Sequence, residues 1–132
     1  MAAPVLDSYA LLAYLRDEAG ADAVQALLEK ASRKDAPLLM TEVNYAEVKY
    51  ITLRKDGEEA WKKVAASLDS LPVAFLPATH ALADAAADFK AGHRISLADA
   101  FAAALAKERK SELVTGDPEL KALEKEIKIH WL

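Results

Sequence analysis

The sequence contains no cysteine, four glycines, 7% aromatic residues and no long apolar run. Without cysteine, disulfide frameworks and thiolate metal sites are excluded, and the reducing cytoplasm is the expected location. No apolar stretch approaches the roughly 20 residues that cross a bilayer, so no membrane segment is expected. The N-terminus up to Asp7 carries no basic side chain and too short an apolar stretch to predict a signal peptide.

An excess of positive charge is also missing, because 17 basic residues face 21 acidic ones and the net charge is −4. This balance argues against a broad electrostatic grip on nucleic acid. It does not exclude an enzyme whose acids hold metal ions, since bound cations can attract phosphate themselves. With 132 residues, 53% of them hydrophobic and 29% charged, the chain is expected to form one globular domain over residues 1–132.

Five short apolar runs predict strands. They span residues 4–6, 37–40, 73–76, 113–115 and 127–131. The first four suit buried parallel strands, whereas the last alternates apolar and polar residues as a half-exposed edge strand does.

Helical patterns fill the gaps between these strands. They span residues 9–18, 21–33, 43–55, 58–71, 80–91, 97–110 and 118–125. The alternation predicts an α/β fold with right-handed βαβ units around a mostly parallel five-stranded sheet. Ligands of such sheets bind outside the carboxyl ends of the strands, so this edge is where chemistry is expected.

Three aspartates stand where a helix cap and a metal ligand are both possible. Asp7 follows the first predicted strand, and Asp117 follows the fourth and precedes Pro118. Asp99 lies three residues after Ser96, as in a capping box. Taken singly, Asp7 and Asp117 read more readily as N-caps than as ligands. Asp99 gains weight as a ligand because its helix is apolar almost all round and is expected to be buried.

Glu47 is the acid that a structural role explains least well. In the predicted helix 43–55 it shares a face with Val43, Ala46 and Tyr50, which we interpret as the core-facing stripe. A carboxylate on such a stripe is unfavourable unless it is paired or bound to metal. The alternative is a partly exposed acid at the edge of the stripe.

Together, the acids predict one pocket. Two lie at the carboxyl ends of strands, and two lie in early turns of helices that start from the same edge of the sheet. Four converging carboxylates repel one another unless a cation is present. All-oxygen ligands suit Mg²⁺ or Mn²⁺, which also bind substrate phosphate.

Four ordered blocks of the sequence carry a family resemblance. Residues 5–8 (VLDS), 41–48 (TEVNYAEV), 96–100 (SLADA) and 113–117 (LVTGD) resemble the blocks of PIN domains. The likeness is greatest to the small VapC toxins of VapBC toxin–antitoxin pairs, and it extends over essentially the whole chain. It implies a three-layer α/β/α sandwich, a Mg²⁺-dependent endoribonuclease in which Mn²⁺ can substitute, a homodimer, and a VapB-like antitoxin as partner.

The resemblance also implies roles for individual residues. By position, Asp7, Glu47, Asp99 and Asp117 are the catalytic and metal-binding acids, and RNA cleavage leaves 5′-phosphate and 3′-hydroxyl ends. Further residues are weaker candidates for substrate binding, namely Ser8, Thr115 and Arg94. Gly116 departs from relatives that carry a side chain there, which removes one potential RNA contact.

Other interpretations remain open. The chain could be an RNA-processing nuclease without a toxin role, or a non-catalytic PIN-like module that binds RNA or protein. Some other classes fit poorly: a haloacid-dehalogenase-like phosphatase needs an aspartate where Tyr9 stands, a receiver domain needs one where residues 77–79 read PAT, and no Gly-rich phosphate loop is present.

The predicted helices between residues 9 and 33 are rich in apolar side chains. The residues concerned are Leu11, Leu12, Tyr14, Leu15, Val24, Leu27 and Leu28. Core packing is the simpler explanation, and a groove or dimer surface for an antitoxin helix is the alternative.

Overall fold

The computed structural model describes residues 2–132. The strands are β1 (Val5–Leu6), β2 (Leu38–Thr41), β3 (Val73–Leu76), β4 (Leu113–Thr115) and β5 (Ile129–Trp131). The helices are α1 (Ser8–Leu15), α2 (Ala21–Lys34), α3 (Glu42–Asp56), α4 (Glu58–Leu68), α5 (His80–Gly92), α6 (Leu97–Arg109) and the 3₁₀ helix η1 (Pro118–Leu123). Each strand and helix expected from the sequence is therefore present, with shifts at some ends.

The shifted helix ends have local causes. Helix α1 ends at Leu15 rather than residue 18, because Asp17 adopts a left-handed conformation with φ 52°. Helix α4 ends at Leu68, a few residues before Pro72, whose ring disfavours a helical conformation at Leu71. The expected helix over 118–125 is a shorter 3₁₀ helix that ends at Leu123.

The five strands form one sheet in the order β3-β2-β1-β4-β5, and each neighbouring pair is parallel. The expectation of a mostly parallel five-stranded sheet is confirmed. From β1 the chain runs outward through β2 to β3, then crosses back to place β4 on the other side of β1. The order of strands thus reverses between β1 and β4, and the carboxyl ends of strands at such a reversal form the usual ligand crevice.

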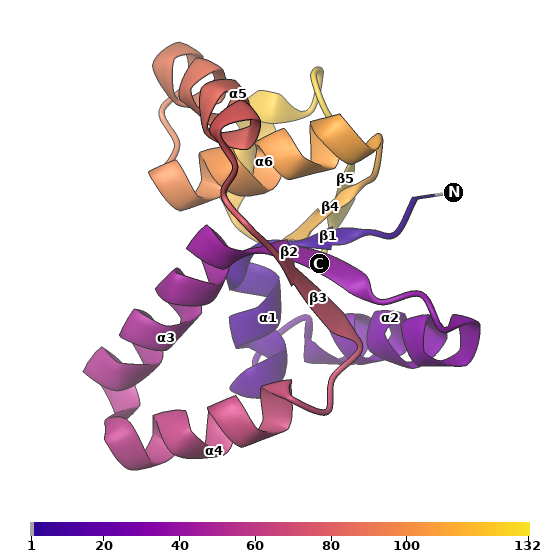
Figure 1. The fold of residues 1–132 in the computed structure, drawn as a ribbon, viewed down its shortest axis with the longest axis vertical. Coiled ribbons are helices and arrows are strands. Elements are labelled where there is room, and N and C mark those ends of the chain that lie inside the picture. The colour runs from indigo at the N-terminus through magenta and orange to yellow at the C-terminus, as the bar shows by residue number, and fades with distance from the viewer. Residues whose placement is uncertain (1) are drawn as a thin grey trace.

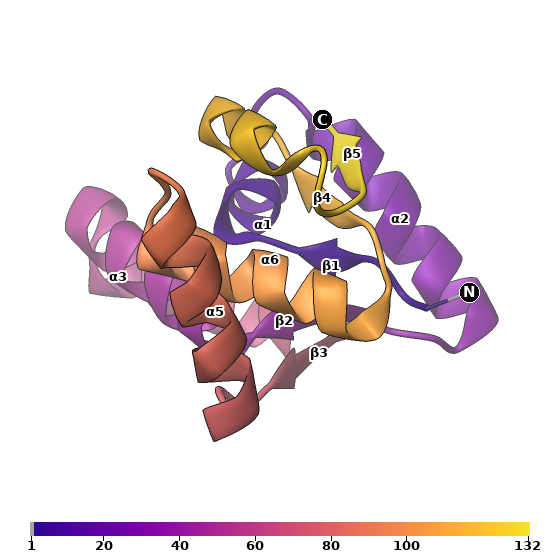
Figure 2. The same cartoon turned by 90° about the horizontal axis from the view of Figure 1, so that it is seen from above.

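Helices cover both faces of the sheet, which gives the three layers that the resemblance to PIN domains implies. In Figure 1, α5 and α6 lie above the sheet and α1 to α4 lie below it. Viewed from above, α6 crosses over β1 and β2, with α5 beside it (Figure 2). Alternate strand residues serve the two layers: Val5 and Leu113 pack with α5 and α6, whereas Leu6 and Val114 pack with α1 and α2.

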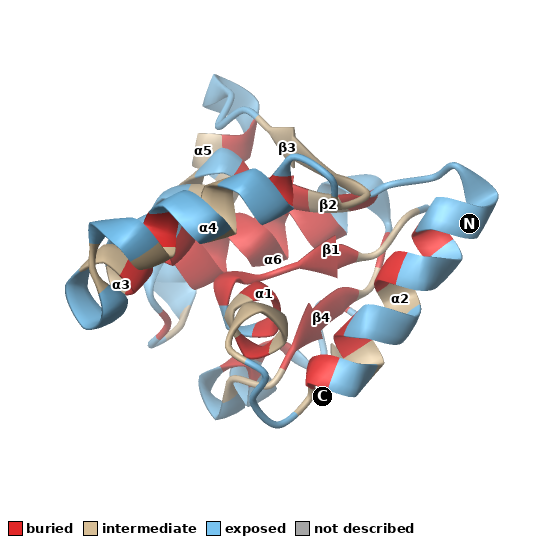
Figure 3. Ribbon diagram, turned by 90° about the horizontal axis from the view of Figure 1, so that it is seen from below, coloured by how far each residue is buried: buried red, intermediate tan, exposed pale blue. Residues whose placement is uncertain are grey.

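The burial of the strands corrects one expectation. Strands β1 and β4 are buried throughout, but all four residues of β3 are only half-buried because β3 is an edge strand (Figure 3). The prediction of a buried strand over 73–76 was therefore wrong in its environment, although its bounds are correct. The half-exposed edge strand expected near the C-terminus is confirmed as β5. Over residues 2–132, no helix is both long and apolar enough to cross a membrane.

Candidate active site

Asp7 lies at the end of β1, where the strand order reverses, and its side chain is fully buried. It is the N-cap of α1, and its Oδ1 accepts a hydrogen bond from the backbone N–H of Ala10 at 2.8 Å. The hydroxyl of Thr115, the last residue of β4, donates to the other carboxylate oxygen. Both oxygens of Asp7 are thus oriented by donors from two elements.

The Thr115 hydroxyl also connects Asp7 to the next acid. Its oxygen accepts a hydrogen bond from the backbone N–H of Asp117 at 3.0 Å. Asp117 is the N-cap of η1, and its Oδ1 accepts from the N–H of Glu119 at 3.0 Å. One hydroxyl therefore ties the acid after β1 to the acid after β4.

Asp99 reaches the same edge of the sheet from α6. Ser96 caps this helix and accepts a hydrogen bond from the N–H of Asp99 at 3.1 Å, as the capping-box prediction requires. Asp99 is 6% exposed, and the alanine-rich helix that follows is buried up to Ala106. Capping and membership of the acidic cluster are compatible roles, because a helix N-terminus favours negative charge.

Burial raises the pKa values of these two acids, and the neighbouring carboxylates raise them further. Burial raises the pKa of Asp7 to about 7, hydrogen bonds from Thr115 and Ala10 oppose the rise, and the charges of Asp99 and Asp117 add to it. Burial likewise raises the pKa of Asp99 to about 6, with further contributions from the charges of Asp117 and Glu47. The four acids named from the sequence therefore form one electrostatically coupled group.

Glu47 joins this group by a different route from the one expected. The buried face of α3 consists of Asn44, Val48 and Thr52, while Ala46 and Tyr50 are exposed. The predicted core-facing stripe was thus wrong, because residues spaced by four from Asn44 face the sheet and α6. Glu47 lies beside that stripe and is half-buried, which leaves its carboxylate accessible.

Asn44 is a polar residue whose role the sequence did not predict. It is fully buried, and its Nδ2 donates to Ser8 Oγ at 3.1 Å and to the carbonyl of Ala98 at 3.2 Å. Thr41 donates its hydroxyl to Asn44 Oδ1. One amide therefore links α1, α3 and α6, which are the helices that carry or follow Asp7, Glu47 and Asp99.

Glu119 was also missed. Carboxylate oxygens of Asp99, Asp117 and Glu119 lie within 4.8 Å of one another. The available signal was its position in the first turn of η1, two residues after Asp117.

This donor set fits a divalent cation. Within residues 2–132, no lysine, arginine or histidine forms an ion pair with any of the five acids. Buried carboxylates that raise one another's pKa without a basic partner favour a hard cation with oxygen ligands, such as Mg²⁺ or Mn²⁺.

The candidate substrate-binding hydroxyls lie inside the protein. Ser8 is 3% exposed and exchanges hydrogen bonds with Asn44, and Thr115 is fully buried against Asp7. Their observed contacts position other side chains. A direct contact of either hydroxyl with substrate stays a prediction.

Arg94 is the cation that the structure leaves available near Ser96. Lys49 lies over the ring of Trp61, Arg54 lies over the ring of Tyr50, and Lys90 donates to the carbonyl of Ile95 at 2.7 Å. Arg94 is exposed and has no hydrogen bond or ion pair with the rest of residues 2–132.

The apolar residues of α1 and α2 pack mainly into the core. Leu11, Val24 and Leu28 are buried. The remaining four, Leu12, Tyr14, Leu15 and Leu27, are half-buried and pack against the same apolar clusters. Core packing thus accounts for these residues, and a docking groove there stays a prediction.

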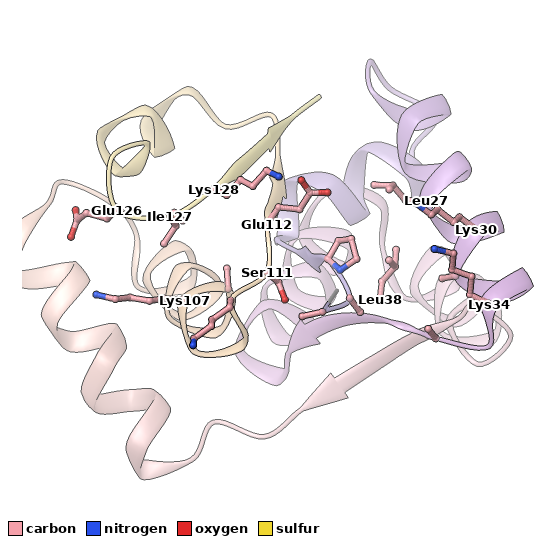
Figure 4. Close-up of a pocket in the computed structure, with 17 residues that line it drawn as sticks. Leu27, Lys30, Lys34, Leu38, Lys107, Ser111, Glu112, Glu126, Ile127 and Lys128 are labelled. Carbon is pink, nitrogen blue, oxygen red and sulfur yellow. The ribbon is translucent and has the colours of Figure 1, made fainter.

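A cavity of about 580 Å³ lies at the other end of the strands, next to their amino ends. Among residues 2–132, none of the five acids lines it. Figure 4 shows Lys30 and Lys34 on its α2 side and Lys107 on its α6 side, and the apolar side chains of Leu27 and Leu38 also line it. Lys34 and Lys107 lie in the last turns of α2 and α6, where a positive charge complements the helix dipole, and lysine stems can cover apolar surface.

Comparisons with known proteins agree with this architecture. The model of the PIN domain family matches residues 5–126. Among solved structures, DNA-bound VapBC from Salmonella typhimurium has a TM-score of 0.75 at 17% identity, over 98% of both chains. VapBC2 from Rickettsia felis, bound to a promoter DNA fragment, has a TM-score of 0.73 at 16% identity, also over 98% of both chains. VapC20 from Mycobacterium tuberculosis, described as a sarcin-ricin loop cleaving toxin, has a TM-score of 0.70 at 17% identity, over 91% of this chain and 94% of that one. No curated protein matches the sequence.

Proposed function

The chain belongs to the PIN domain family, and on that basis we propose that it is a Mg²⁺-dependent endoribonuclease in which Mn²⁺ can substitute. The observation that carries this proposal is the coupling of Asp7, Glu47, Asp99 and Asp117 at the point where the strand order reverses. A phosphodiester needs charge stabilisation and an activated water for hydrolysis. One or two divalent cations supply both when bound.

The side chains of the proposed site have distinct tasks. Asp7 and Asp99 hold the first cation, and Asp117 and Glu47 complete its surroundings directly or through water. Thr115 keeps the carboxylate of Asp7 in one orientation, and Asn44 fixes the relative positions of the three helices. Because ligands must be deprotonated, the raised pKa values of Asp7 and Asp99 make cation binding release protons near neutral pH.

Substrate contacts are proposed mainly for Arg94. Its exposed guanidinium lies in the loop between α5 and α6, just before the helix that carries Asp99, and can pair with an RNA phosphate in a bidentate manner. In this proposal Thr115 acts through Asp7, to which its hydroxyl donates, and Ser8 acts through Asn44, with which it exchanges hydrogen bonds.

A cleavage assay tests the proposed activity. Purified protein is incubated with single-stranded RNA and with DNA of the same sequence, with Mn²⁺, with Mg²⁺ and with EDTA. We expect metal-dependent RNA cleavage that Asp7→Asn and Asp99→Asn reduce at least about a hundredfold. Asp88→Asn, an exposed acid on α5, is the matched control and should cleave like the wild type. Full activity of Asp7→Asn, or cleavage in EDTA, would refute the proposal.

The biological role proposed is the toxin of a toxin–antitoxin pair in the cytoplasm, with a VapB-like antitoxin as inhibitor and a homodimer as the assembly. The support is the similarity in fold to VapBC complexes. Expression of the wild type and Asp7→Asn in a bacterial host, followed by sequencing of new RNA 5′ ends, tests this role. Growth arrest with discrete cuts only in the wild type is expected. Cuts without growth arrest would instead indicate an RNA-processing nuclease.

A further inference from the structure

Tyr9 is an exposed aromatic residue beside the buried acids. It lies in the first turn of α1, two residues after Asp7, and 44% of it is exposed. Its neighbours Ser8 and Ala10 are buried, so the helix itself packs closely at this point.

One side of the Tyr9 ring, from Cδ1 to Cζ, closely approaches Gly116. A Cβ atom added to Gly116 would come within 2.3 Å of Tyr9 Cε1 and 2.9 Å of Cζ. Gly116 is not among the residues with positive φ, so its conformation does not call for glycine. The close approach of the ring is therefore what excludes a side chain at this position.

This contact places the ring at the edge of the acidic cluster. Gly116 lies between Thr115 and Asp117 in the chain. Thr115 donates a hydrogen bond to Asp7, and a carboxylate oxygen of Asp117 lies within 4.8 Å of one of Asp99. The glycine backbone supports one side of the ring, and the exposed remainder faces solvent. A ring held in this way is ordered before any ligand arrives, so little conformational entropy is lost on stacking.

We propose that Tyr9 is a stacking platform for an unpaired nucleobase next to the scissile phosphate, an inference that rests on the proposed ribonuclease function. The chain is acidic overall, with 17 basic against 21 acidic residues, so phosphate contacts alone give weak binding. Base–aromatic stacking supplies sequence-tolerant affinity. The stacked base must be unpaired, because duplex bases already stack on each other.

The test combines enzyme variants with a modified RNA. A short single-stranded RNA with one cleavage site is compared with the same RNA lacking the base beside that site. The variants are Tyr9→Ala and Tyr9→Phe, and Tyr50→Ala is the control. Tyr50 is a similarly exposed tyrosine (45%), but it lies on α3, where the Arg54 guanidinium covers its ring. Cleavage with Mn²⁺ gives KM and kcat, and fluorescence anisotropy in EDTA gives RNA affinity without metal.

We expect Tyr9→Ala to raise KM and to weaken binding about tenfold. Tyr9→Phe and Tyr50→Ala should match the wild type. The RNA without the base should bind the wild type as weakly as intact RNA binds Tyr9→Ala, with no further loss when both changes are combined. The stacking role would be overturned if Tyr9→Ala had the KM and RNA affinity of the wild type. It would also be overturned if the variant and the missing base each weakened binding independently of the other.

Failure of the proposed function gives a different result. If the wild type cleaves RNA and Tyr9→Ala does so equally well, only the stacking role is wrong. If the wild type cleaves nothing, the ribonuclease proposal fails, and anisotropy still shows whether Tyr9 binds a base.

Gly116→Ala provides a second, independent variant. The added methyl group displaces the ring without altering any acid. The same rise in KM is expected, with no additional rise in the Tyr9→Ala and Gly116→Ala double variant and with unchanged Mn²⁺ affinity. If Gly116→Ala raises KM as much in the Tyr9→Ala background as in the wild type, displacement of the ring is not the cause.

Discussion

Thr115 and Asp7 are 108 residues apart in the chain, yet the threonine hydroxyl donates directly to the aspartate carboxylate. The same hydroxyl accepts from the N–H of Asp117 at 3.0 Å, so it fixes both strand-end acids. This hydrogen bond lowers the pKa of Asp7 against the larger opposing effect of burial. Thr115 therefore keeps a buried carboxylate available for a cation near neutral pH.

Removal of this hydroxyl should weaken cation binding. In Thr115→Val the pKa of Asp7 rises further, and Mn²⁺ affinity near pH 7 is expected to fall about tenfold. The loss should shrink as the pH is raised, because the carboxylate then ionises without help. Calorimetric titration over a pH series measures this, with Thr115→Ser, which keeps the hydroxyl, as control. Equal affinities of Thr115→Val and the wild type at every pH would contradict the role of the hydroxyl.

The metal-free protein should lose stability as the pH rises. The folded-state pKa values of Asp7 and Asp99, about 7 and about 6, lie above the ordinary value of 3.8. The stability that the protonated carboxyl groups of Asp7 and Asp99 contribute is therefore fully present below about pH 4 and is lost as the pH rises through about 7. In EDTA near pH 8, Asp7→Asn should be more stable than the wild type by roughly 2–4 kcal/mol, and this advantage should vanish near pH 4.

Urea unfolding of both proteins at the two pH values measures the difference. Saturating Mn²⁺ should reverse the order near pH 8, since it stabilises only the protein that binds it. If Asp7→Asn is less stable than the wild type in EDTA near pH 8, the charge of Asp7 does not destabilise the folded protein.

Asn44 should contribute to the stability of the fold. Asn44→Ala leaves Ser8, Thr41 and the Ala98 carbonyl without their buried partner. The expected loss in the free energy of unfolding is roughly 2–4 kcal/mol, because several buried polar groups lose their hydrogen bonds. Gln25→Ala, at an exposed amide paired with Glu29, should change stability by no more than about 0.5 kcal/mol. Comparable small losses in both variants would mean that Asn44 does not connect the helices energetically.

Glu119 should assist cation binding without being essential. Its carboxylate lies in the group with Asp99 and Asp117, but it is exposed and thus held less firmly. Glu119→Gln is expected to lower Mn²⁺ affinity roughly tenfold, the size of effect seen for groups that support metal ligands. Glu124→Gln, an exposed acid just after η1, is the control. Unchanged affinity in Glu119→Gln would remove Glu119 from the site.

Local sequence was sufficient to predict most of the fold and the strand-end acids. Asp7 and Asp117 could be placed because each follows a short apolar run, and parallel strands end at a common edge. The capping box at Ser96 placed Asp99 equally well. These signals depend on a few neighbouring residues, which is why they could be recognised in a single sequence.

Features that depend on distant contacts could not be predicted in this way. The edge position of β3 follows from strand order, which the apolar run over 73–76 does not encode. The buried face of α3 carries Asn44, whose contacts with Ser8 and Ala98 come from distant segments, so an apolar stripe alone was the wrong guide. The contact between Tyr9 in α1 and Gly116 just after β4 likewise joins residues that are far apart in the sequence.

The central claim is that the clustered carboxylates form one divalent-cation site. Calorimetric titration of Mn²⁺ into the wild type near pH 6, in two buffers of different ionisation enthalpy, tests it most directly. We predict saturable binding with release of about one to two protons per site, because Asp7 and Asp99 are partly protonated at that pH. Asp7→Asn should lose most of the affinity and part of the proton release. Absence of saturable binding, or identical binding by Asp7→Asn, would contradict the account.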